Sequence, residues 1–221
     1  KYLEGRTEPS IPQTEWKQLN FDDSTWKSGP SGFSVGFGSY NAPTKLQGMP
    51  GEYSSVYLRK VFDIDDIDWI KSLILRVDYD DGFVAYINGT EVARSNNVPN
   101  SLTWNSGATT YHDDSLAINY VSFNTNSGIE SLENGSNILA IHLLNSGISS
   151  SDILCIPQLV ATIIQGNDNG ITIQDTVDLR VRSKSGNTWS ALNQAIFSNN
   201  QVKENLRITE IMYNPDAPDA E

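Results

Sequence analysis

The chain has 221 residues, which is enough for one large β domain or for a domain of about 150 residues with a smaller piece attached. Its net charge of -12 and its lack of a basic cluster exclude a nucleic-acid partner, because Lys and Arg supply the affinity for phosphate backbones. No run approaches the roughly 18 apolar residues that cross a bilayer, so we expect no membrane insertion.

The acidic balance also bears on glycan partners. It disfavours sulfated or uronic polysaccharides at long range, although a local Arg or Lys pocket or a bound divalent cation could still accept one, and neutral glycans fit the charge better. The single cysteine, Cys155, lies in the apolar run 153–156 and is expected to be a buried thiol. No signal peptide or initiating Met precedes Lys1, so we interpret the chain as a fragment of a longer protein.

The first segment, up to Ser55, combines turn residues with many aromatic side chains. Its glycines permit sharp bends, and its aromatic residues can bury enough surface to order it. We therefore expect a wrapped lead-in with short strands, in which Trp16 and Trp26 are core residues.

Regular alternation begins at Val56 and continues to Phe62, which is the period of a strand with one buried and one wetter face. The next two β-rich runs, 73–79 and 83–87, are joined by Asp80-Asp81-Gly82, and Asn88-Gly89 then leads into 91–94. Both connections consist of residues that tolerate left-handed backbone. The sequence therefore predicts two successive hairpins.

A polar stretch without periodicity, 95–117, is long enough to be an ordered or functional loop. After it, strands resume, which makes at least seven before Gln165; these later runs are 119–123, 137–144 and 153–164. No helical crossover is available to join parallel neighbours. The spacing therefore predicts an antiparallel sandwich.

Several of these runs carry a family resemblance. They are Tyr57–Phe62, Leu73–Val77, Ala85–Gly89, Val92–Arg94 and Asn137–Ile141. Together they resemble the sugar-binding jelly roll of family 2 glycoside hydrolases and its galactose-binding-like relatives. The resemblance implies an all-β fold, an antiparallel β-sandwich of the galactose-binding-like jelly-roll kind, over residues 1–165.

Two later pieces are similar to other modules of large secreted bacterial proteins. Residues 181–197 resemble the terminal hairpin of Ig-like chitobiase C-terminal domains, and 206–215 resemble the first strand of a lamin-tail domain. These resemblances imply a β-hairpin extension over 166–204, which begins at a Gly-rich linker, and a truncated lamin-tail-like segment over 205–221. They also imply a secreted or cell-surface bacterial protein whose neighbouring domains are partners of this one.

Asp78, Asp80 and Asp81 form the sharpest acidic group, and their oxygens could bind a calcium ion. Strand alternation places Asp78 and Asp80 on one face, so at most two carboxylates converge without help. The alternative is hairpin capping with a salt bridge to an arginine such as Arg94. The resemblance implies that related domains often hold a structural calcium near one edge, but that ligand set maps onto no residues here.

A sugar site needs an aromatic face and planar polar groups at its rim. Two groups on segments interpreted as loops supply that mixture and are the predicted ligand-binding residues: Tyr40 with Asn41, and Trp104 with Tyr111, His112 and Asp113. The alternative is that Trp104 and Tyr111 plug an end of the sandwich.

Catalytic motifs are weak in this sequence. A Ser-His-Asp arrangement would use His112 or His142, and His142 alternates within a strand, where a satisfied, half-buried histidine is expected. We therefore expect a non-catalytic module that binds a polysaccharide or cell-surface glycan. The alternatives are a structural spacer or adhesion module without a sugar ligand, and a fragment of a glycoside hydrolase or lyase, whose paired carboxylates the sequence alone does not reveal.

Overall fold

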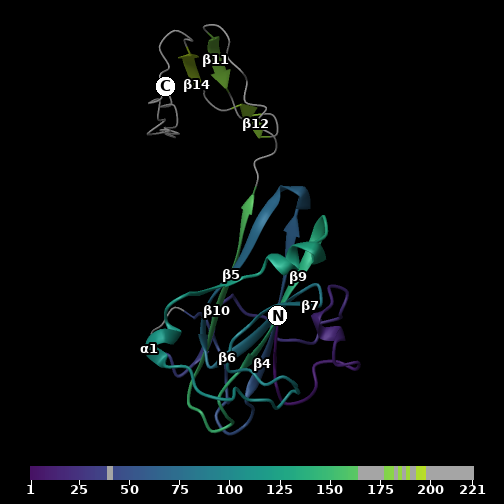
Figure 1. The fold of residues 1–221 in the computed structure, drawn as a ribbon, viewed down its shortest axis with the longest axis vertical. Coiled ribbons are helices and arrows are strands. Elements are labelled where there is room, and N and C mark those ends of the chain that lie inside the picture. The colour runs from purple at the N-terminus through teal and green to yellow at the C-terminus, as the bar shows by residue number, and fades with distance from the viewer. Residues whose placement is uncertain (39–41, 164–176, 182–183, 186–187, 190–192, 198–221) are drawn as a thin grey trace, which may run out of the picture. The chain divides into compact units, whose positions relative to one another are not determined.

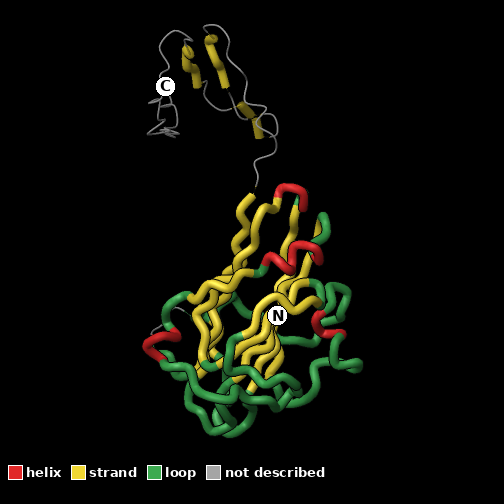
Figure 2. The backbone as a smooth tube through the Cα atoms, in the orientation of Figure 1, coloured by secondary structure: helices red, strands yellow, loops and turns green. Residues whose placement is uncertain are grey.

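The computed structural model describes residues 1–38, 42–163, 177–181, 184–185, 188–189 and 193–197. The chain divides into two compact units, residues 1–166 and 167–221. Strands dominate the first unit, and its helical elements are short, as Figures 1 and 2 show. Its strands are β1 (Tyr2–Glu4), β2 (Phe33–Val35), β3 (Thr44–Lys45), β4 (Ser55–Ile64), β5 (Ile70–Asp80), β6 (Gly82–Ile87), β7 (Thr90–Arg94), β8 (Val121–Asn124), β9 (Gly135–Leu144) and β10 (Ile153–Ile163). Its helical turns are η1 (Glu15–Lys17), η2 (Ile67–Trp69), α1 (Asp114–Ala117) and η3 (Asn126–Ser131).

These strands form two five-stranded sheets. The first sheet has the order β1-β4-β9-β6-β7 and the second the order β3-β2-β10-β5-β8. The pairs are antiparallel, apart from the short parallel pair of β2 and β3. From β4 to β10 the chain repeatedly changes sheet, as it does in a jelly roll. The predicted antiparallel β-sandwich is therefore confirmed.

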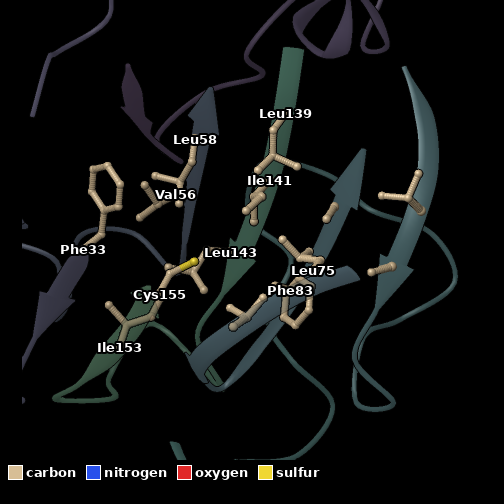
Figure 3. Packing of buried hydrophobic residues seen from close by; sticks show 14 of the residues in the cluster. Phe33, Val56, Leu58, Leu75, Phe83, Leu139, Ile141, Leu143, Ile153 and Cys155 are labelled. Carbon is tan, nitrogen blue, oxygen red and sulfur yellow. The ribbon is translucent and has the colours of Figure 1, made fainter. Parts of the chain in front are cut away.

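Two-residue alternation along the strands builds the core between the sheets. In β4, Val56 and Leu58 point inward, and in β9 Ile141 and Leu143 do the same, each at most 5% exposed. Figure 3 shows these side chains in one cluster, in which Leu143 lies beside Cys155 of β10 from the opposite sheet. Cys155 is fully buried and forms no disulfide, as predicted.

The outer face of the first sheet is buried as well. Tyr57 and Arg59 of β4 are only 2% and 4% exposed, so the wetter face predicted for this strand is wrong at these two positions. The lead-in causes the difference, because it lays Trp16 and Trp26 over this face. Both tryptophans are buried, as predicted.

The predicted hairpin at Asp80-Asp81-Gly82 is wrong. β5 pairs with β10 and β8, whereas β6 pairs with β9 and β7, so the chain crosses from one sheet to the other here. Turn residues permit a sharp bend in both cases and do not specify which strand becomes the partner. The hairpin at Asn88-Gly89 is confirmed: the φ angles of these residues, 47° and 89°, are both positive, as a two-residue type I′ turn requires.

In the second unit, β11 (Val177–Val181) pairs antiparallel with β14 (Asn193–Phe197), and β12 (Lys184–Ser185) pairs with β13 (Thr188–Trp189). The hairpin extension over 166–204, with its resemblance to a chitobiase C-terminal domain, stays a prediction. The linker 166–170 and the segment 205–221 lie outside the described residues. Among the helices of the described ranges, none is long and apolar enough to cross a membrane.

Candidate functional site

A pocket of about 310 Å³ lies on the outer face of the first sheet, where the lead-in covers it; we call it the outer-face pocket. This volume is at the lower end of the range of about 300–1,000 Å³ that is usual for small-molecule sites. Its lining comes from η1, from β4, β6, β7 and β9, and from the loop after β7. The lining residues are Gln13, Thr14, Trp16, Lys17, Tyr57, Tyr86, Gly89, Glu91, Arg94, Asn100, Leu102 and His142.

Strand alternation explains why these residues meet. In β4, β6 and β9, Tyr57, Tyr86 and His142 occupy the positions that point away from the core. Tyr57 and His142 are direct partners across the β4–β9 ladder. The tight turn at Asn88-Gly89 then returns the chain, so that β7 places Glu91 opposite Tyr86.

Trp16 is the centre of the aromatic wall. Its ring lies edge-on to Tyr57, Tyr86 and His142, at centroid distances of 4.8, 5.8 and 6.3 Å. The rings of Tyr57 and His142 are stacked on each other at 4.2 Å. These contacts make the wall rigid and apolar, while the polar ends of its side chains remain to be satisfied.

One buried polar atom of this wall lacks a partner within the described part of the chain. His142 is 2% exposed, and its Nε2 atom forms no hydrogen bond. Complete burial lowers the pKa of His142 to about 3, so the ring is neutral at physiological pH. Burial also raises the pKa of Tyr86 to about 12 and that of Tyr57 further still, which keeps both hydroxyls protonated. The prediction of a satisfied, half-buried His142 is therefore wrong.

The charged groups of the pocket differ in how they are engaged. Arg94 holds Glu91 through two bonds of 2.8 Å and donates a third to the carbonyl of Pro99, so this pair is largely neutralised. Lys17 places its ammonium 4.2 Å from the centre of the Tyr86 ring. In the described ranges no carboxylate lies within ion-pair distance of Lys17.

None of the predicted sugar-binding residues that the structure describes lines the outer-face pocket. Tyr40 and Asn41 lie outside the described residues. Trp104 is half-buried and packs against the aromatic cluster over the first sheet. Tyr111 is 77% exposed. The predicted role of these residues in binding stays a prediction.

The other two loop residues make local contacts. His112 stacks on Tyr79 with ring centroids 4.4 Å apart, and its Nδ1 atom lies 2.8 Å from the carbonyl oxygen of Tyr79. Asp113 caps α1, because its carboxylate accepts a hydrogen bond of 2.9 Å from the backbone of Ser115. Both side chains thus contribute to the order of the loop that follows β7.

The three aspartates proposed as calcium ligands are all buried, at 2–3% exposure. Asp81 accepts hydrogen bonds from the backbone N–H groups of His112 and Ser146. Burial raises the pKa of Asp80 to about 8, with further contributions from Asp81 and Asp152. Within the described ranges no three His, Cys, Asp or Glu side chains gather into a group that could hold a metal ion, so the geometry gives the calcium prediction no support. The alternative salt bridge to Arg94 is not formed either, because Arg94 pairs with Glu91.

No residue of the outer-face pocket was among the ligand-binding residues predicted from the sequence, because the pocket residues are far apart in the chain. One signal could have identified them. Three neighbouring strands of the first sheet carry Tyr57, Tyr86 and His142 at outward positions, where a solvated face would carry charged residues. Large aromatic residues on both faces of a strand indicate that a second layer covers the outer face. The aromatic lead-in was the candidate for that layer.

No protein-family model and no curated protein matches this sequence. Solved structures with detectable similarity include a β-glucuronidase of Bacteroides uniformis (19% identity, TM-score 0.39), an α-L-rhamnosidase of Aspergillus terreus (16%, 0.35) and a β-D-mannosidase of Dictyoglomus thermophilum (19%, 0.28). The matches cover 70%, 66% and 46% of this chain. The chain spans only 16%, 16% and 10% of the lengths of those proteins. They are distant likenesses over a part of each glycosidase.

Proposed function

We propose that the first unit is a non-catalytic carbohydrate-binding module of a secreted or cell-surface protein, and that it holds a sugar in the outer-face pocket. The observation that carries the proposal is a hollow with an aromatic wall in which a buried polar atom has no partner among the described residues. Within the described ranges this atom is the buried Nε2 of His142, and the side chains of Tyr57 and Tyr86 line the same hollow. A buried polar atom without a partner costs stability, so a ligand that supplies the missing hydrogen bonds is favoured.

A sugar matches this wall better than a wholly apolar ligand would. Its hydroxyl groups both donate and accept, which suits tyrosine hydroxyls and a neutral imidazole. Asn100 and Gln13 add side-chain amides at the same pocket. A structural spacer gives no reason for such a hollow over an otherwise covered sheet face.

The acid–base inventory of the pocket supports binding over hydrolysis. Glycoside hydrolysis normally uses two carboxyl groups, one on each side of the scissile bond. The lining of the outer-face pocket includes one carboxylate, Glu91, and Arg94 holds it through both of its oxygens. The pocket therefore suits a role in retention of a glycan rather than in its cleavage.

Calorimetric titration with a panel of neutral, acidic and amino sugars and their oligomers tests the proposal. Tyr57→Phe and Tyr86→Phe each remove one hydroxyl and leave the ring packing in place. Each should weaken binding by about tenfold, the equivalent of one hydrogen bond. Tyr111→Ala is the matched control, because it removes an exposed aromatic residue that does not line the pocket.

The same panel separates the two locations for a sugar site. If Tyr111→Ala abolished binding and both Tyr→Phe variants bound as the wild type does, the loop would be the site and the outer-face pocket would not. If no sugar bound to the wild type, the carbohydrate function itself would fail.

A further inference from the structure

The rings of the outer-face pocket are already engaged with one another and with Lys17. Tyr57 and His142 cover each other, Lys17 lies over Tyr86, and Trp16 is packed edge-on against all three rings. A neutral pyranose usually gains much of its affinity by placing its apolar side on an aromatic face. In this pocket a sugar would contact mainly the edges of the aromatic rings and their polar atoms. Its affinity must therefore come from an interaction other than stacking.

The ammonium group of Lys17 provides such an interaction. Its stem is half-buried, and desolvation lowers the pKa of its ammonium group, an effect that the charge of Glu91 only partly offsets. Glu91 is held by Arg94, and Glu8 of the lead-in accepts hydrogen bonds from Gln13 and from the backbone of Trp104. Glu15, two residues before Lys17 in η1, forms no ion pair with it in the described ranges. Lys17 is therefore the charged group of the lining without a counter-ion among the described residues.

We infer that the outer-face pocket selects sugars that carry an anionic substituent, a carboxylate or a sulfate, and that Lys17 is the residue that binds this substituent. The inference rests on the proposed carbohydrate-binding function. A charge-assisted hydrogen bond to a partly desolvated ammonium is about twice as strong as a neutral one. It gives the pocket a preference that stacking alone would not give.

This inference reverses the expectation, drawn from the net charge of -12, that neutral glycans fit the chain better. The net charge acts at long range, and salt screens exposed charges beyond about 8 Å at physiological ionic strength. A contact with Lys17 is made at hydrogen-bonding distance and is screened much less. The local charge therefore decides which sugar is retained once it reaches the pocket.

The test compares matched sugars on matched variants of the full chain. Glucuronic and galacturonic acid, glucose 6-sulfate and galactose 6-sulfate, and glucose and galactose form three arms that differ in the charged group. Each is titrated into the wild type, Lys17→Met, which keeps most of the stem, and Lys17→Arg, which keeps the charge. Circular dichroism confirms that each variant is folded.

The expected result is at least a tenfold preference of the wild type for one anionic arm over the neutral arm, lost in Lys17→Met and retained in Lys17→Arg. The preferred arm identifies the anion as carboxylate or sulfate. Equal binding of neutral and anionic sugars would overturn the inference and leave the carbohydrate function standing. A preference that persisted in Lys17→Met would overturn the role of Lys17, and a lack of binding in all arms would overturn both.

Discussion

Asp80 and Asp81 are neighbours in the chain and differ in their hydrogen bonding. Asp81 accepts hydrogen bonds from two backbone N–H groups, one on each oxygen of its carboxylate. The Oδ1 atom of Asp80 has no hydrogen-bond partner in the described part of the chain, and burial raises its pKa to about 8. One carboxylate therefore stabilises the fold, and the other destabilises it at neutral pH.

Asp80→Asn should raise the free energy of unfolding at pH 8 by about 1–3 kcal/mol and change it little at pH 4. The Asp80 carboxyl ionises near pH 4 in the unfolded chain but stays protonated up to about pH 8 in the folded one. Asp80 therefore lowers the free energy of unfolding progressively more as the pH rises from 4 to 8. Urea denaturation at both pH values measures it. A loss of stability at pH 8 would contradict this assignment.

Asp81→Asn should have the opposite effect on stability to Asp80→Asn. An amide accepts through one oxygen only and turns its NH₂ group toward the other backbone N–H donor, at His112 or Ser146. We expect a loss of about 1–3 kcal/mol in the free energy of unfolding at both pH values, measured in the same urea experiments. An unchanged stability would mean that these two hydrogen bonds contribute nothing.

His142 makes stability depend on pH in acid. Its pKa is about 3 in the folded chain and near 6.5 in the unfolded one, so the unfolded state binds the proton first. Stability should therefore fall as the pH drops from about 6.5 toward 3, by up to about 1.4 kcal/mol per pH unit from this residue. His142→Phe keeps a ring against Tyr57 and should flatten the profile in that window. An identical acid profile in the variant would contradict the burial of a neutral imidazole.

At the scale of elements, Arg59 of β4 ties the lead-in to the first sheet. It is 4% exposed, pairs with Asp23 at 2.8 Å, and donates to backbone carbonyls of the lead-in, among them those of Trp16 and Gln18. The turn-rich segment has few ladder hydrogen bonds of its own. One buried guanidinium thus fixes the wall of the outer-face pocket.

Arg59→Met should cost about 3 kcal/mol, because it leaves Asp23 and several carbonyls without their partner. The loss should be local as well, with faster amide hydrogen exchange from Trp16 to Asp23 than in β9. Lys60→Met is the matched control: Lys60 is exposed on the same strand, and the change should stay within about 0.5 kcal/mol. Uniform acceleration of exchange across both sheets would argue against a tether.

The elements that could be predicted from sequence are those whose pattern is local. Period-two alternation identified the long strands, and Asn88-Gly89 identified its hairpin because both residues adopt positive φ. Asp80-Asp81-Gly82 led to the wrong prediction of a hairpin, because a connection that crosses between sheets uses the same turn residues. The outer-face pocket was not predicted from the sequence, because its wall joins Trp16, Tyr57 and His142. Only the pairing of β4 with β9 in the folded chain brings Tyr57 and His142 together.

At the scale of the whole molecule, the buried clusters formed by the described residues belong to the first unit. The core between the sheets and the aromatic cluster over the outer face are built from residues between Tyr2 and Leu159. The second unit is described through its two antiparallel strand pairs. Because each domain is stabilised by its own core, the first unit should fold without the second.

A chain that ends at Gly166 should therefore unfold cooperatively, with a midpoint within a few degrees of that of the first unit in the full chain, as measured by calorimetry. A chain that ends at Asp152 is the matched control. It lacks β10, which lies at the centre of the second sheet between β2 and β5, and it should not fold. Failure of the longer chain to fold would mean that the second unit contributes to the core.

The central claim is that a glycan binds on the outer face of the first sheet. An NMR titration of the ¹⁵N-labelled chain with the preferred sugar tests it most directly. We expect the largest shifts at the indole N–H of Trp16 and at the amides of Lys17, Gly89 and Glu91. Shifts confined to Tyr111, His112 and Asp113 would place the site on the loop and contradict the claim.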